Sequence, residues 1–215
     1  ISTRLAVFMQ GMVMATLEAT EATLALFEEQ GGTLTTKDAL ELGILPRTLY
    51  ALRDQGALER LSRGLYRLAD LPPLAHPDLV VVSRRVSRAV ICLVSALAFH
   101  GLTTQIPHAV DVALPSRARR PRLSYPPLRV FWFSGPAWSE GIAIHPLDGT
   151  DVCIYSPEKS LADAFKYRHK LGLDIALEAL RLYIGGGNLQ VEALLRYARI
   201  CRVEEVMRPY LESLL

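Results

Sequence analysis

The stretch that decides the fold is TTKDALELGILPRTLYALRDQGALERLSRGLYRL, residues 35–68. It opens with Thr35, and Asp38 follows three residues later. This spacing is a partial capping box, in which the threonine side chain closes the start of a helix. We therefore expect a short helix at residues 37–42, ended by Gly43.

A second helix and a hairpin follow within the same stretch. Pro46 stands at the favoured first position of a helix that runs until Gly56 supplies a left-handed cap. Two short runs, at 58–61 and 65–68, then have strand character. The glycine-containing loop at 62–64 suits a hairpin between them.

A longer amphipathic helix precedes these elements, from about residue 15 to Glu29, and Gly31-Gly32 closes it. Helix, short helix, helix and hairpin is the order of a winged helix-turn-helix. We assign residues 14–70 to this domain and treat residues 1–13 as an N-terminal extension.

The chain changes character after residue 70. Three prolines in the segment 71–77 cannot continue a regular element, so we place a linker there. Residues 78–215 then mix helical and strand patterns, which predicts an α+β domain that ends in helices. Its expected helices lie at 78–86, 88–99, 156–167, 174–183 and 189–199, and its expected strands at 109–114, 128–133, 142–145 and 152–155.

Composition and charge limit the classes of function that this chain can have. Half of the 215 residues are hydrophobic and 21% are charged, which excludes a disordered polar chain. The net charge is only +2, but residues 46–131 hold 13 arginines, no lysine and five acidic residues. A basic centre between acidic ends is typical of a polyanion binder when its arginines share a face.

The cysteines and the apolar runs indicate the compartment. Cys92, Cys153 and Cys201 lie far apart without metal-ligand spacing, which favours a reducing cytoplasm and predicts neither a metal site nor a cofactor. No uncharged apolar run approaches the ~20 residues that span a bilayer. We therefore expect a cytoplasmic protein that makes no membrane contact.

The second helix of a helix-turn-helix enters the major groove with its N-terminal residues at the base edges. Arginine side chains make bidentate hydrogen bonds to guanine or to phosphate, and hydroxyl groups contact a base or the DNA backbone. Arg63, beside Gly64 at the hairpin tip, stands where a wing meets the minor groove or the backbone. The expected DNA-binding residues are Arg47, Thr48, Tyr50, Arg53, Arg60, Arg63 and Arg67. A module that docks on another protein is the alternative for this pattern.

A second basic segment lies between two expected strands of the second domain. Its four arginines are Arg117, Arg119, Arg120 and Arg122. They are equally consistent with a second phosphate-binding tip and with a solvated hairpin end.

An enzymatic interpretation rests on Asp151, Glu158 and Lys159, acids and a lysine of the kind that metal-dependent nucleases use. The spacing disfavours it, because that chemistry needs an acid and a lysine one residue apart on a strand. Here Glu158 and Lys159 are adjacent at a helix start, where an acid favours the positive helix end. We predict no catalytic residues and keep a metal-dependent nuclease as the rival function.

Three blocks follow one another along the chain: GALERLSRGLYRL at 56–68, SALAFHGLT at 95–103 and PEKSLADAFKYR at 157–168. In this order they resemble the AbiEi antitoxin family of type IV toxin-antitoxin systems. Any one block is weakly specific, whereas the ordered set is strong. In the last block, Lys166 and Arg168 are candidates for a basic surface in the second domain.

The resemblance implies a transcriptional repressor whose winged helix-turn-helix binds inverted repeats of double-stranded DNA in its own promoter. It also implies a C-terminal domain that counteracts a nucleotidyltransferase-like toxin of the AbiEii family, in the family's usual description without a stable complex. A stand-alone regulator with no toxin gene is the alternative. Since no dimer helix is evident, we expect a monomer in solution or pairing on DNA.

Overall fold

The computed structural model describes residues 19–214, so the extension predicted at residues 1–13 lies outside the described residues. The chain forms two compact units. The first runs to Pro77 and includes the short segment Leu147–Thr150, and the second comprises Asp78–Pro146 and Asp151–Leu215. In the described part of the chain, no helix combines the length and the apolar character needed to cross a membrane.

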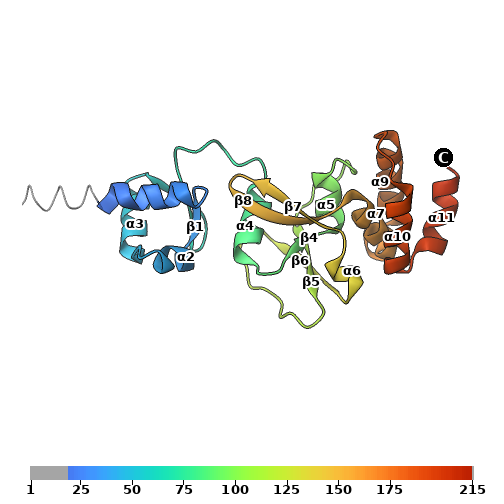
Figure 1. The fold of residues 1–215 in the computed structure, drawn as a ribbon, viewed down its shortest axis with the longest axis horizontal. Helices are drawn as coiled ribbons and strands as arrows, with labels where there is room; N and C mark the ends of the chain where they lie inside the picture. The colour runs from blue at the N-terminus through green and yellow to red at the C-terminus, as the bar shows by residue number, and fades with distance from the viewer. Residues whose placement is uncertain (1–18, 215) are drawn as a thin grey trace, which may run out of the picture. The chain divides into compact units, whose positions relative to one another are not determined.

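The first unit contains the predicted order of elements (Figure 1). A helix described over residues 19–29 comes first. It is followed by β1 (Thr33–Thr35), α2 (Thr36–Glu41), α3 (Pro46–Asp54), β2 (Leu58–Ser62) and β3 (Leu65–Leu68). The strands form a three-stranded antiparallel sheet in the order β1-β3-β2. Two helices joined by a turn and followed by a hairpin are the arrangement of a winged helix-turn-helix, and we call the β2–β3 hairpin the wing.

The cap predicted at the start of α2 is confirmed. The Thr35 side chain accepts a hydrogen bond from the backbone N–H of Asp38 at 3.1 Å, and the Asp38 carboxylate accepts one from the backbone N–H of Thr35 at 3.2 Å. These bonds satisfy donors that the first turn of a helix otherwise leaves unpaired. The sequence pattern did not predict β1, because three residues are too short to show an alternation.

A small core fixes α3 against the rest of the first unit. Phe27, Leu49, Leu52 and Leu58 are each at most 2% exposed, and they come from the N-terminal helix, α3 and β2. Leu49 and Leu52 lie three residues apart and so share one face of α3. Burying that face turns the opposite side of α3 toward solvent.

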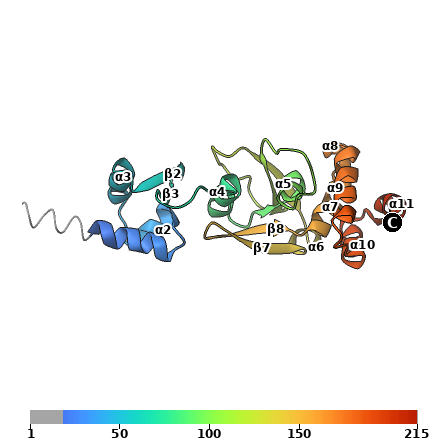
Figure 2. The ribbon, with the colours of Figure 1, turned by 90° about the horizontal axis from the view of Figure 1, so that it is seen from above.

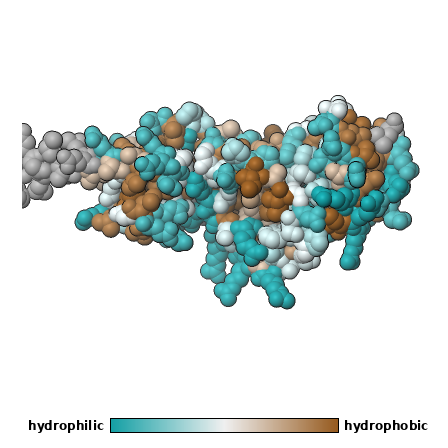
Figure 3. All heavy atoms as spheres, in the orientation of Figure 1, coloured by the Kyte–Doolittle hydropathy of each residue, from teal (hydrophilic) through white to brown (hydrophobic). Residues whose placement is uncertain are grey.

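The second unit is built on a five-stranded mixed sheet in the order β6-β5-β4-β8-β7. Its strands are β4 (Val90–Ile91), β5 (Val110–Pro115), β6 (Leu128–Phe133), β7 (Ile142–Leu147) and β8 (Thr150–Tyr155), and its first helices are α4 (Pro77–Arg85), α5 (Leu93–Phe99) and α6 (Pro136–Ser139). In the space-filling view, apolar patches are set among hydrophilic side chains on this unit (Figure 3). The mixed helix and sheet content agrees with the predicted α+β class.

The helix predicted at 88–99 is wrong in its first half. Arg88 has a left-handed backbone with φ of 62°, which breaks a helix at that point. Val90 and Ile91 instead form the central strand, which runs antiparallel to β5 and parallel to β8. β-Branched side chains fit such a buried strand, so tertiary pairing overrides the local helical pattern.

Five helices follow the sheet in the described chain. They are α7 (Pro157–Lys166), α8 (Arg168–Leu171), α9 (Leu173–Gly185), α10 (Val191–Cys201) and α11 (Glu204–Glu212). Ser156 caps α7 by accepting a hydrogen bond from the backbone N–H of Lys159 at 3.3 Å. Figures 1 and 2 show α7, α9 and α10 gathered together, and Phe165, Leu180 and Leu194 are fully buried among them.

Candidate nucleic-acid interface

The exposed face of α3 carries the residues predicted to contact DNA. Arg47 is exposed in its first turn, Thr48 is half-buried, and Tyr50 has 47% of its surface exposed. Pro46 occupies the first helical position, where its missing N–H leaves no bond unmade. The helix therefore presents the Arg47 guanidinium and the Tyr50 phenol on the side opposite its buried leucines, and the Thr48 hydroxyl lies at the border of the buried face.

The wing carries two further exposed arginines. Arg60 lies on β2, and its Nε donates to the backbone oxygen of Ser62 at 3.2 Å. Arg63 is exposed at the tip next to Gly64, whose φ of 72° makes the tight reversal. The backbone N–H of Thr36 donates to the Gly64 oxygen at 2.9 Å, which ties the wing tip to the start of α2.

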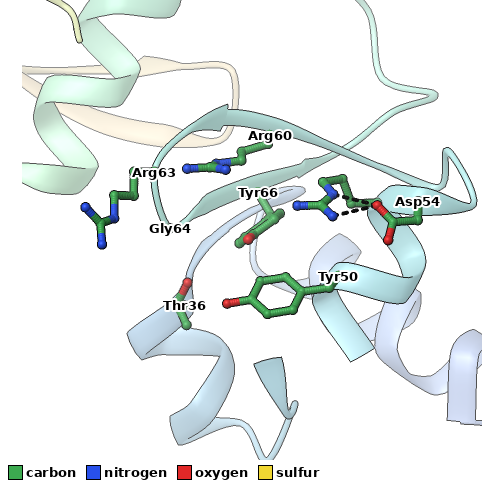
Figure 4. A pocket seen from close by; sticks show the side chains of 8 residues that line it. Thr36, Tyr50, Asp54, Arg60, Arg63, Gly64 and Tyr66 are labelled. Atoms are coloured by element: carbon green, nitrogen blue, oxygen red, sulfur yellow. Dashed lines mark hydrogen bonds and ion pairs between the residues drawn. The ribbon is translucent and has the colours of Figure 1, made fainter. Parts of the chain in front are cut away.

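An open cavity of 660 Å³ lies between α3 and the wing (Figure 4). The Tyr50 hydroxyl points toward Thr36, and Arg60 and Arg63 come from the wing. Its lining comprises Thr36, Tyr50, Arg53, Asp54, Arg60, Arg63, Gly64 and Tyr66. Three guanidinium groups against one carboxylate make this cavity an electropositive hollow suited to a phosphate group.

The sequence did not predict that Asp54 restrains Arg53. Arg53 donates to Asp54 Oδ1 from Nε at 2.9 Å and from Nη2 at 2.6 Å. The hydrogen bond and charge of Asp54 raise the pKa of Arg53, and the guanidinium carbon lies 5.6 Å from the centre of the Tyr50 ring. Asp54 therefore offsets part of the positive charge that Arg53 brings to the cavity.

Arg67 does not belong to the exposed surface, although the sequence placed it among the DNA contacts. It is 4% exposed, and its Nη1 lies 2.9 Å from Glu59 Oε1. Its Nη2 donates to the backbone oxygen of Pro72 at 2.5 Å. Arg67 therefore links the wing to the chain that follows it, and we remove it from the candidate contacts.

The second basic set comes from two places in the second unit. Arg117, Arg119, Arg120 and Arg122 are all exposed on the connection between β5 and β6. The hairpin expected there is wrong, because β5 and β6 run parallel and the connection must return along the strands. Lys166 is exposed beside Phe133, and Arg168 donates to the backbone oxygen of Phe165 at 2.9 Å.

Two residues of the rival nuclease interpretation, Glu158 and Lys159, are engaged with separate partners. Lys159 is fully buried and pairs with Asp163 at 2.5 Å. Glu158 instead accepts hydrogen bonds from Ser156 at 2.9 Å and from the Tyr183 hydroxyl at 2.7 Å. Within residues 19–214, no group of three or more histidine, cysteine and acidic side chains is placed to hold a metal ion.

The comparison with known families concerns the first unit. Residues 21–69 match the family described as "Transcriptional regulator, AbiEi antitoxin". The AbiEi resemblance of the wing block is thereby confirmed, since residues 56–68 lie within the matched segment. The other two blocks lie outside it. The matched AbiEi segment contains α2, α3 and the wing, and therefore the whole lining of the cavity.

A solved structure supports the fold beyond the AbiEi segment. The crystal structure of the RV2827C protein from Mycobacterium tuberculosis is similar over 90% of this chain and 80% of that one, with a TM-score of 0.56 and 16% sequence identity. At that identity the likeness concerns the fold alone. No curated protein matches the sequence.

Proposed function

We propose that this protein is a repressor that binds double-stranded DNA through its first unit and regulates its own promoter. The observation that carries the proposal is the electropositive cavity between α3 and the wing, which three arginines from α3 and the wing line. The AbiEi match over the same residues supports it. Neutralising phosphates with such arginines releases counterions and supplies affinity.

We expect DNA contacts of two kinds. Arg47 and Thr48 lie in the first turn of α3, the part of a recognition helix that meets base edges. Arg60 and Arg63 lie on the wing, and we expect them to contact the phosphate backbone. We expect the first pair to set sequence preference and the second pair to contribute affinity for any duplex.

The remaining parts of the proposal are what the AbiEi resemblance implies. The operator is an inverted repeat, on which two chains pair. The second unit counteracts a nucleotidyltransferase-like toxin of the AbiEii type in the cytoplasm. If the protein is a stand-alone regulator without a toxin, it has the DNA-binding role but not the antitoxin role.

The test is fluorescence anisotropy of the full chain on ~150 base pairs upstream of its gene, with a scrambled duplex for comparison, at low and near-physiological salt. Arg47→Ala is expected to lose roughly 1–3 kcal/mol on the upstream duplex and to relax the preference. Arg63→Ala should weaken both duplexes and lower the salt slope by about 0.9. Arg181→Ala, which removes an exposed arginine of α9, is the matched control.

Equal binding of both duplexes that disappears at the higher salt would overturn the repressor proposal. The toxin role has its own experiment, in which the neighbouring gene is expressed with and without this protein. Growth arrest that this protein does not relieve would overturn the antitoxin role and leave the DNA result untouched.

A further inference from the structure

A second cavity lies wholly within the second unit, between the loop at 103–109 and the start of α9. Its volume is 220 Å³. Its walls are of mixed character. Val94, Ile106, Leu171 and Ile175 supply apolar surface, whereas the polar side chains are those of Gln105, His108, Arg129 and Lys170. An apolar cavity with a few converging polar groups is the usual form of a small-molecule site.

The guanidinium of Arg129 is held in a fixed position. It donates from Nε to Asp111 Oδ1 at 2.5 Å and from Nη2 to Asp111 Oδ2 at 2.7 Å. The Asp111 side chain is fully buried and also accepts from the backbone N–H of Val94 at 3.1 Å, whereas the Arg129 side chain is 48% exposed. Nη1 takes part in neither bond to Asp111.

Burying the Asp111 carboxylate costs free energy, and its pairing with Arg129 offsets that cost. Burial raises the pKa of Asp111, and the hydrogen bonds and charge of Arg129 oppose that rise. A buried carboxylate is tolerated when it is paired and hydrogen-bonded. The two bonds to Asp111 fix the orientation of the guanidinium, and the edge that carries Nη1 remains available at the cavity.

The loop that forms one wall is also held in place. Glu178 of α9 accepts hydrogen bonds from the Thr104 backbone at 3.0 Å, the Thr104 hydroxyl at 2.7 Å and the Thr103 hydroxyl at 3.1 Å. Three bonds to one carboxylate anchor the loop just before Ile106, whose surface is 83% exposed. These bonds fasten the loop to α9 beside the cavity.

We propose that this cavity binds a small organic monocarboxylic acid, with its carboxylate at Arg129 and Lys170 and its apolar part against Ile106 and Ile175. Asp111 already offsets the charge of Arg129, so Lys170 leaves a net charge of about +1, which favours a monoanion over a phosphate dianion. The planar fork of arginine matches a carboxylate. Its lining shares no residue with the cavity between α3 and the wing.

The test is an NMR titration of the full-length chain with hexanoate, acetate and inorganic phosphate as probes. Hexanoate is expected to give saturable shifts of the Val94, Ile106 and Ala109 amides and to bind at least about tenfold more tightly than acetate, because it buries more methylene groups. Phosphate is expected to bind more weakly than hexanoate.

Two variants change exposed positions, so that the fold is retained. Lys170→Gln should weaken hexanoate about tenfold, and Ile106→Ser should weaken hexanoate while leaving acetate unchanged. Arg181→Gln, at an exposed arginine of α9 outside the cavity, is the control and should bind as the parent does. Shifts that do not saturate, tighter binding of phosphate than of hexanoate, or unchanged affinity in Lys170→Gln would each overturn the proposal.

Discussion

Arg67 and Glu59 face each other across the wing, with 2.9 Å between Nη1 and Oε1. The arginine is almost entirely buried, while the glutamate side chain keeps 45% of its surface exposed. Four residues earlier, Arg63 is exposed at the wing tip. The two arginines of this hairpin therefore differ in role: Arg67 stabilises the wing, and Arg63 presents a positive charge at its tip.

This difference gives the first prediction. Arg67→Ala should lower the free energy of unfolding by about 1–3 kcal/mol, because it leaves two backbone oxygens and Glu59 without their donor. Arg63→Ala should change it by less than about 0.5 kcal/mol. Urea denaturation followed by circular dichroism measures both. A stable Arg67→Ala variant with weakened DNA binding would restore Arg67 to the contacts.

The second prediction concerns Asp54. Asp54→Asn should raise the affinity for DNA several-fold at low salt, because it frees Arg53 and removes a negative charge from the cavity. The gain should shrink as salt increases. Asp70→Asn, which removes an exposed acid outside the cavity, is the control for net charge. Equal gains in both variants would argue that Asp54 acts only through overall charge.

The third prediction concerns the buried pair of α7. Lys159→Met should destabilise the protein by about 3–5 kcal/mol, because Asp163 keeps its burial and loses its counter-ion. Adding Asp163→Asn to Lys159→Met should recover part of that loss, since the buried group is then neutral. Thermal unfolding of the parent and both variants measures the effect. A double variant as unstable as Lys159→Met would show that packing, not charge, dominates.

The same pair fixes the sign of a pH dependence. Burial raises the pKa of Asp163, and Lys159 opposes that rise. Without Lys159 the native state binds more protons than the unfolded state above about pH 4, so stability must fall as pH increases. The melting temperature of Lys159→Met should therefore drop more steeply than that of the parent between about pH 5 and pH 8.

The fourth prediction tests the cap of α2. Thr35→Ala should cost about 1 kcal/mol, because the Asp38 backbone N–H loses its acceptor. Thr35→Ser keeps the hydroxyl and should lose much less. Chemical denaturation of the two variants separates the cap from the threonine methyl group, and equal losses would contradict a role for the hydrogen bond.

The sequence predicted the elements whose signals are local. Thr35, Pro46 and Gly56 mark helix boundaries through their own backbone preferences, and the structure confirms α2, α3 and the wing. The sequence did not predict the strand at Val90 or the three-residue β1, because each is stabilised by pairing with a strand far along the chain. A strand of two or three residues carries too little pattern to outweigh its neighbours.

The candidate site divides in the same way. The residue types and their order determined which helix presents Arg47 and which turn presents Arg63, because periodicity and turn chemistry act over a few residues. Only the tertiary structure decided that Arg67 is buried beneath Glu59, that Asp54 holds Arg53, and that Asp111 aims Arg129 into a cavity. Burial and long-range pairing depend on what packs against a side chain, and that is a property of the whole fold.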